Sequence, residues 1–208
     1  MLINDDLLLA IDAKINDLGS EYSQVQGLFL TEDDLKCNLY SKLVQIPHLA
    51  EPEITADAWI KASKVHAELS WFNGDEKLRT IPDITILDPK NLSIIHAVQP
   101  GFDLPNKQCH FVGDAIIFEL KFIRDNEGIT KKTLRSVKKD VAKAKRLYNK
   151  IADDGNRFSL VCYIVFFAKV SLEDDSVIQH FQAEMATDNR FRVFYKSGGV
   201  SLTDPCLS

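Results

Sequence analysis

The 208-residue sequence lacks the short motifs that mark several large classes of enzyme and metalloprotein. Its four cysteines form no CxxC pair and its five histidines show neither HExxH nor HxH spacing, which argues against a zinc site or iron–sulfur cluster held by local spacing. A glycine-rich phosphate loop, a GxSxG elbow and a dinucleotide-binding fingerprint are also absent. We expect reduced, mostly structural thiols.

Long apolar segments are missing too. No stretch approaches the ~20 apolar residues that a membrane-spanning helix needs, and the longest apolar run, residues 160–168, is expected to be a buried strand. The first residues lack the basic flank and cleavage site of a signal peptide, so we expect a soluble, cytoplasmic protein with no membrane partner. Because the net charge is −5, a nucleic-acid site would have to be a local basic patch.

Hydrophobic periodicity divides the chain into alternating helices and strands. Three- to four-residue spacing predicts helices over residues 4–18, 31–46, 131–151 and 173–186. Apolar or alternating runs predict strands over residues 65–72, 79–87, 112–123, 158–170 and 191–195, with a hairpin turn at 73–77 and an extra strand near 94–98. We expect one α/β domain over residues 1–208, with a mixed sheet flanked by helices, a core at about 31–170 and a C-terminal helix–strand unit at 173–196.

One predicted strand carries an acid and an amine on the same face. Side chains alternate along residues 112–123, so Glu119 and Lys121 point away from the Phe118 and Leu120 side and lie about 7 Å apart at ~3.3 Å per residue. Burying such charges is costly unless they are paired or bind an ion. A simple Glu–Lys ion pair on a half-exposed strand is the alternative.

A second acid stands in the apolar run 79–87. Aspartate is depleted in strand interiors, and Pro82 removes a hydrogen-bond donor just before Asp83. If Asp83 and Glu119 converge from neighbouring strands, their carboxylates and a backbone carbonyl provide the oxygen ligands that Mg²⁺ prefers. Glu68, on the preceding strand, either joins this site or faces water.

Pro82-Asp83 followed by Glu119-Leu120-Lys121 resembles the PD-(D/E)xK motif of restriction-endonuclease-like nucleases. The predicted order of elements is similar to the αβββαβ core of that family. The resemblance implies a nuclease that hydrolyses phosphodiester bonds with Mg²⁺, or Mn²⁺ as a substitute, and favours a DNA endonuclease of restriction or repair type. It further implies that Asp83, Glu119 and the Leu120 carbonyl bind the metal while Lys121 orients or deprotonates the attacking water.

The same resemblance implies a catalytic acid on the first core helix, where Glu32 is the candidate. Thr31 and Asp34 also resemble a capping box, which would explain the acids of this turn without catalysis. The helix at 131–151 is strongly basic, and four of its cations are expected to contact the phosphate backbone: Arg135, Lys138, Lys139 and Arg146. A homodimer would suit cleavage of both strands of a duplex.

Two other interpretations stay open at this point. The protein could be a non-catalytic module on a nuclease fold that binds nucleic acid or protein, an alternative that the acidic net charge and the single basic helix leave open. Alternatively, the motif is accidental and the chain is an unrelated α/β protein. The presence of Asp83, Glu119 and Lys121 together favours the nuclease, since a module that does not cut has no need of all three.

Overall fold

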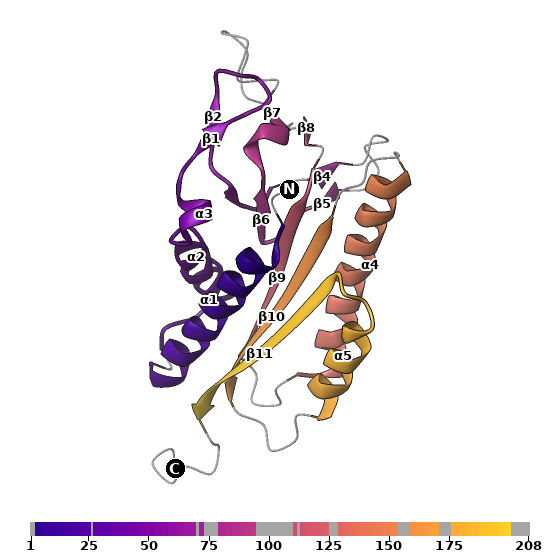
Figure 1. Cartoon of the computed structure of the whole chain (residues 1–208). Coiled ribbons are helices and arrows are strands. Elements are labelled where there is room, and N and C mark those ends of the chain that lie inside the picture. Colours follow the sequence, from indigo (N-terminus) through magenta and orange to yellow (C-terminus); the bar gives the residue numbers. More distant parts are fainter. Residues whose placement is uncertain are drawn as a thin grey trace.

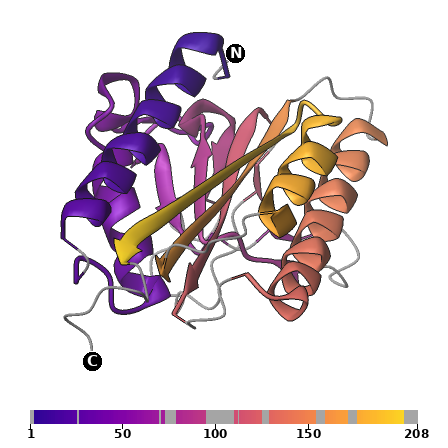
Figure 2. The same cartoon turned by 90° about the horizontal axis from the view of Figure 1, so that it is seen from below.

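A five-stranded mixed sheet lies between two layers of helices (Figures 1 and 2). The computed structural model describes residues 3–25, 27–69, 71–72, 79–94, 110–111, 113–124, 129–153, 159–170 and 176–200. The α/β class and the mixed sheet predicted from the sequence are confirmed. Within these ranges, no helix has the length and apolar character required to cross a membrane.

The helices cover opposite faces of the sheet, as Figure 2 shows from below. One face carries α1 (Asp5–Gln24) and α2 (Glu32–Leu43), and the other carries α4 (Lys131–Asp153) and α5 (Ser176–Ala186). The short helix α3 (Pro47–Ala50) follows α2. Each layer closes over its own apolar core, and the sheet separates the two cores.

The strand order is β11-β10-β9-β6-β3. Three parallel neighbours form one half of the sheet: β9 (Ala115–Ile123), β10 (Leu160–Val170) and β11 (Phe191–Val200). The other half is antiparallel, with β6 (Ile84–Leu87) paired to β9 and β3 (Val65–Ala67) paired to β6. A parallel connection needs a crossover, and α4 provides it between β9 and β10.

Small antiparallel pairs lie outside the main sheet. They are β1 (Glu53–Ile54) with β2 (Lys61–Ala62), β4 (Trp71–Phe72) with β5 (Arg79–Thr80), and β7 (Leu92–Ser93) with β8 (His110–Phe111), and a 3-10 turn (Pro89–Asn91) precedes β7. The β4–β5 pairing confirms the predicted hairpin. Its turn at 73–77 and the extra strand predicted near 94–98, apart from residue 94, lie outside the described residues.

The predicted alternation along β9 is confirmed, and both of its faces are buried. Ile116, Phe118 and Leu120 belong to the core under α1 and α2, whereas Ala115 and Ile117 belong to the core under α4 and α5. An acid at position 119 therefore points into an apolar layer beneath α4 rather than towards water.

The predicted end of the first helix at residue 18 is wrong. The helix α1 continues through Gly19 as far as Gln24, and the missing side chain leaves room for the Lys196 side chain of β11: a Cβ there would lie 2.7 Å from Cδ of Lys196. The final strand is also longer than predicted and runs to Val200. Here glycine allows close packing of a helix against a strand and does not act as a stop signal.

The predicted strands 65–72 and 79–87 are each interrupted. The first breaks at Glu68, whose backbone is left-handed with φ of 51°, and the second breaks around Pro82, which has no N–H for the ladder. As a result β6 begins only at Ile84, opposite Phe118, while β9 continues to Ile123. The second half of β9 thus has one open edge where β6 is missing.

Candidate active site

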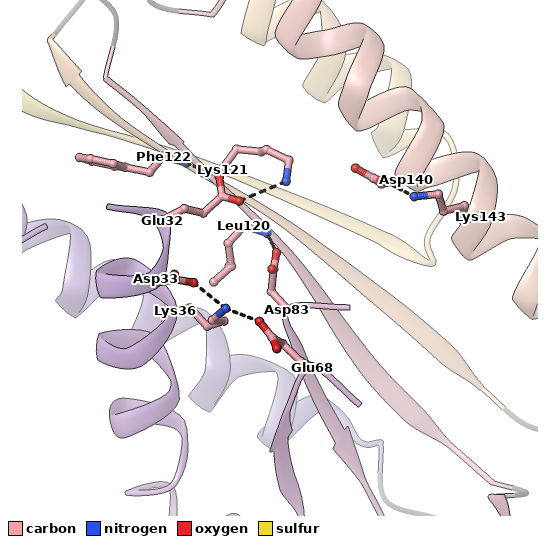
Figure 3. A network of polar contacts seen from close by, with 10 residues as sticks. All are labelled: Glu32, Asp33, Lys36, Glu68, Asp83, Leu120, Lys121, Phe122, Asp140 and Lys143. Atoms are coloured by element: carbon pink, nitrogen blue, oxygen red, sulfur yellow. Dashed lines mark hydrogen bonds and ion pairs between the residues drawn. The ribbon is translucent and has the colours of Figure 1, made fainter. Parts of the chain in front are cut away.

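Asp83 closes the first part of this open edge. Its backbone N–H donates to the Phe118 carbonyl at 3.0 Å, and its carboxylate oxygen Oδ2 accepts from the Leu120 N–H at 2.7 Å (Figure 3). The side chain thereby takes the place of the strand partner that β6 does not supply. A buried N–H without an acceptor would cost about 1–3 kcal/mol, so this contact helps to hold Asp83 in place.

Glu32 closes the next position along the same edge. The Phe122 N–H donates to its Oε2 at 3.1 Å, and its Oε1 lies 3.6 Å from Nζ of Lys121. The capping box predicted for Thr31 and Asp34 is present. Glu32 takes no part in it, and its side chain extends to β9 instead. Capping therefore does not account for the position of Glu32.

Glu119 lies near Asp83, just beyond the point where the regular pairing of β6 with β9 ends. That pairing stops with Ile84 opposite Phe118, and the Asp83 N–H also donates to the Phe118 carbonyl, so Asp83 leaves the regular register. The Asp83 carboxylate instead reaches the N–H of Leu120, the residue that follows Glu119. The two acids therefore come from neighbouring chain segments, and a shared ion between them stays a prediction.

The electrostatics of the two acids reflect this closeness. Glu119 is only 9% exposed, and its burial, reinforced by repulsion from Asp83 and Asp140, raises its pKa to about 8. Burial also raises the pKa of Asp83, although the hydrogen bond from Leu120 and the charge of Lys121 oppose the rise. A divalent cation between the carboxylates would remove the repulsion.

The backbone adds a third oxygen to this position. In a β-strand, the N–H and C=O of one residue point to the same side, so the Leu120 carbonyl faces the edge where its N–H meets Asp83. Oxygen ligands of this kind suit Mg²⁺, which keeps several waters. Among the described residues, no three His, Cys, Asp or Glu side chains form a metal-holding group, so a centre here would combine two carboxylates, one carbonyl and water.

Sequence analysis missed a contribution from α4. Asp140 forms an ion pair with Lys143 at 2.7 Å, and Figure 3 shows both on the helix beside the β9 edge. The charge of Asp140 contributes to the raised pKa values of Glu119 and of the buried Cys162 thiol, for which burial is the main cause. The available signal was its position as the single acid in the predicted basic helix over residues 131–151.

Lys36 was missed as well. Its Nζ lies 2.7 Å from Oδ1 of Asp33 and 2.7 Å from Oε1 of Glu68, and its side chain is only 14% exposed (Figure 3). Glu68 in turn donates its backbone N–H to the Asp83 carbonyl at 3.1 Å. Glu68, which the sequence left undecided, therefore lies beside the site and contacts α2.

The predicted basic face of α4 is present, with differences among its four cations. Arg135, Lys138, Lys139 and Arg146 are all exposed. However, Lys138 forms an ion pair with Glu184 of α5 at 2.7 Å, which reduces the charge it can offer to a ligand. Nucleic-acid contact by these residues stays a prediction.

No protein-family model, curated protein or solved structure matches this chain. The functional assignment therefore depends on the geometry of the site. That geometry brings the candidates Asp83, Lys121 and Glu32 to one edge of β9, with the buried Glu119 near Asp83.

Proposed function

We propose that this protein is a metal-dependent nuclease of the PD-(D/E)xK type, acting on DNA phosphodiester bonds. The observation that carries the proposal is the pair of acids at an open strand edge, the half-buried Asp83 and the buried Glu119, where the Asp83 carboxylate lies 2.7 Å from the N–H of Leu120, the residue after Glu119. The order α2, β3, β6, β9, α4, β10 supports a restriction-endonuclease-like core. Lys121 and Glu32 at the same edge add the amine and helix acid that such a site uses.

The residues of this chain have distinct parts in the proposed reaction. Asp83, Glu119 and the Leu120 carbonyl would hold Mg²⁺, which when bound polarises the phosphoryl oxygen and lowers the pKa of its water. The Lys121 ammonium, 3.6 Å from Glu32 Oε1, would orient the attacking water and stabilise negative charge on the phosphate. Glu32 keeps this ammonium near the edge of β9.

The substrate would lie against α4. Arg135, Lys139 and Arg146 form an exposed cationic surface on the helix that also carries Asp140 beside Glu119. Contacts to phosphates would place the duplex without reading its sequence. A homodimer would present two such sites to the two strands.

One observation favours a second candidate, a non-catalytic binding module. The carboxylates of Asp83 and Glu32 already accept the N–H groups of Leu120 and Phe122, so both acids have a structural use without a metal. The burial of Glu119 near Asp83 favours the nuclease, because edge closure gives no reason to bring a third acid to the same place.

A cleavage assay separates the two candidates. Plasmid, linear duplex and single-stranded DNA are incubated with the protein and Mg²⁺, Mn²⁺ or EDTA, alongside Lys121→Ala and the exposed control Lys61→Ala on β2. We expect cleavage that requires the metal, falls by about 10²-fold or more in Lys121→Ala and persists in Lys61→Ala. Unchanged cleavage by Lys121→Ala would refute the mechanism, and DNA binding without any cleavage would establish the binding module.

A further inference from the structure

Lys36 connects two parts of the site that are distant in the sequence. It extends from α2 to Glu68, which follows β3, and its ammonium is shared between Glu68 and Asp33 at 2.7 Å each. The Lys36 side chain is only 14% exposed, whereas the side chains of Asp33 and Glu68 are 81% and 56% exposed. Ion pairs that are this open to solvent contribute little to net stability, so the contact is of interest for the two segments that it joins.

Glu68 is held in a backbone conformation that L-residues rarely adopt. Its φ of 51° costs about 1–2 kcal/mol for a residue with a side chain, so surrounding contacts have to maintain it. Two of those contacts are the ion pair with Lys36 and the N–H that it donates to the Asp83 carbonyl at 3.1 Å. Glu68 therefore joins α2 directly to the backbone of Asp83.

On α2 itself, Lys36 lies four residues after Glu32 and hence on the same side of the helix. Glu32 and Asp83 accept from Phe122 and Leu120, which are two residues apart on one strand edge. Both acids reach this edge only if α2 and the chain break before β6 keep a fixed separation. Lys36 spans this separation through Glu68, and Tyr40 of α2 adds a second link by donating its hydroxyl to the Val65 carbonyl of β3 at 3.2 Å.

We propose that Lys36 is a positioning residue, which holds α2 and the Asp83 segment together through Glu68, so that Asp83 is aligned for the metal and Glu32 for Lys121. This inference rests on the proposed function. Lys36 itself does not touch the reacting atoms. Its effect passes through Glu68 to Asp83 and through the helix to Glu32.

A purely electrostatic role and a positioning role of Lys36 predict opposite changes in metal affinity when Lys36 is replaced. The ammonium is close enough to Asp83 to oppose the rise in its pKa, so as a charge it repels a divalent cation. Its removal would therefore tighten metal binding if charge were its only effect. If Lys36 positions the ligands, its removal weakens metal binding. The direction of the change in metal affinity therefore distinguishes the two roles.

The test measures Mn²⁺ affinity of the full chain by calorimetry for Lys36→Met, Lys36→Arg and the matched control Lys42→Met. Lys42 also lies on α2, is 18% exposed and pairs with Glu21 of α1 at 2.6 Å, away from Asp83. We expect Lys36→Met to lose about 10-fold or more in Mn²⁺ affinity and in kcat, with little change in KM for DNA. Lys36→Arg should retain most of the affinity, and Lys42→Met should match the unsubstituted protein.

A second variant removes the other partner while keeping the backbone. Glu68→Gly accepts the left-handed conformation without strain, so we expect it to stay folded and to weaken Mn²⁺ binding as Lys36→Met does. The double variant should be no worse than either single variant, because both remove one contact. If the losses of Mn²⁺ affinity in the two single variants add up in the double variant, the inference is overturned.

The outcomes distinguish this inference from the proposed function. Equal or tighter Mn²⁺ binding by Lys36→Met, with normal binding by the unsubstituted protein, would overturn the positioning role alone. Absence of both Mn²⁺ binding and cleavage in the unsubstituted protein would overturn the proposed function and this inference with it.

Discussion

The Leu120 N–H donates to Oδ2 of Asp83 at 2.7 Å, at the point where β6 is missing and β9 continues. Two residues further along, the Phe122 N–H donates to Glu32 in the same way. Side-chain carboxylates thus replace a missing strand along this edge. In the proposed nuclease the same carboxylates are held where Mg²⁺ would bind, so fold and function depend on the same contacts.

This double use predicts that two substitutions of Asp83 differ in stability. Asp83→Asn keeps an oxygen that can accept from Leu120, so we expect little change in the free energy of unfolding. Asp83→Ala leaves that N–H without its acceptor and should lose about 1–3 kcal/mol. Urea denaturation in EDTA measures the free energy of unfolding of both variants. Equal losses of unfolding free energy would show that the hydrogen bond does not stabilise the fold. Neither variant should cleave DNA.

The buried Glu119 predicts a stability that depends on pH. Its pKa of about 8 in the folded protein lies above the ordinary 4.5, so between these values the folded state keeps a proton that the unfolded chain releases. The metal-free protein should therefore lose stability as the pH rises from about 5 to 8, at up to about 1.4 kcal/mol for each unit of pKa shift. The pKa of Asp83 is raised as well, so Asp83 contributes to the same loss of stability.

Glu119→Gln is the control for this effect, because the amide does not titrate. We expect its unfolding free energy to change less over the same pH range and to exceed that of the unsubstituted protein near pH 8, with EDTA present. Parallel pH profiles for the two proteins would mean that Glu119 is already ionised in the folded state.

The cations of α4 should contribute unequally to DNA binding. Replacing Arg135 and Lys139 by alanine should reduce the slope of log affinity against log salt by about 2, close to one unit for each phosphate contact. Lys138→Ala should change the slope less, because Lys138 already pairs with Glu184. Binding titrations at several salt concentrations test this, and equal effects of all three cations would contradict the role of that ion pair.

The sequence predicted the elements of the fold better than their interruptions. Alternation along β9 depends only on the two-residue period of a strand, so the faces of Ile117 and Phe118 followed from the pattern. Gly19 was misread because the signal for a helix end is the same as that for close packing, and the contact with Lys196 is a tertiary one. The left-handed backbone of Glu68 has no signal in the residue type.

Only part of the site could be predicted from the sequence. Pro82-Asp83 and Glu119-Leu120-Lys121 stand out because charged residues interrupt apolar strands. The closeness of Asp83 to β9 depends on the pairing of β6 with β9 and on the contact with Leu120, neither of which a single sequence specifies. Lys36 and Asp140 were missed because a lysine on an amphipathic helix and an acid among lysines are usually only parts of a solvated face.

The central claim is that Asp83 and Glu119 share one divalent cation. Calorimetric titration of metal-free protein with Mn²⁺ tests it most directly, with Asp83→Asn and Glu119→Gln as the two variants. The account predicts measurable binding by the unsubstituted protein and a loss of about 100-fold or more in each variant, because each removes a negatively charged ligand. Mn²⁺ binding of equal strength in all three proteins would contradict it.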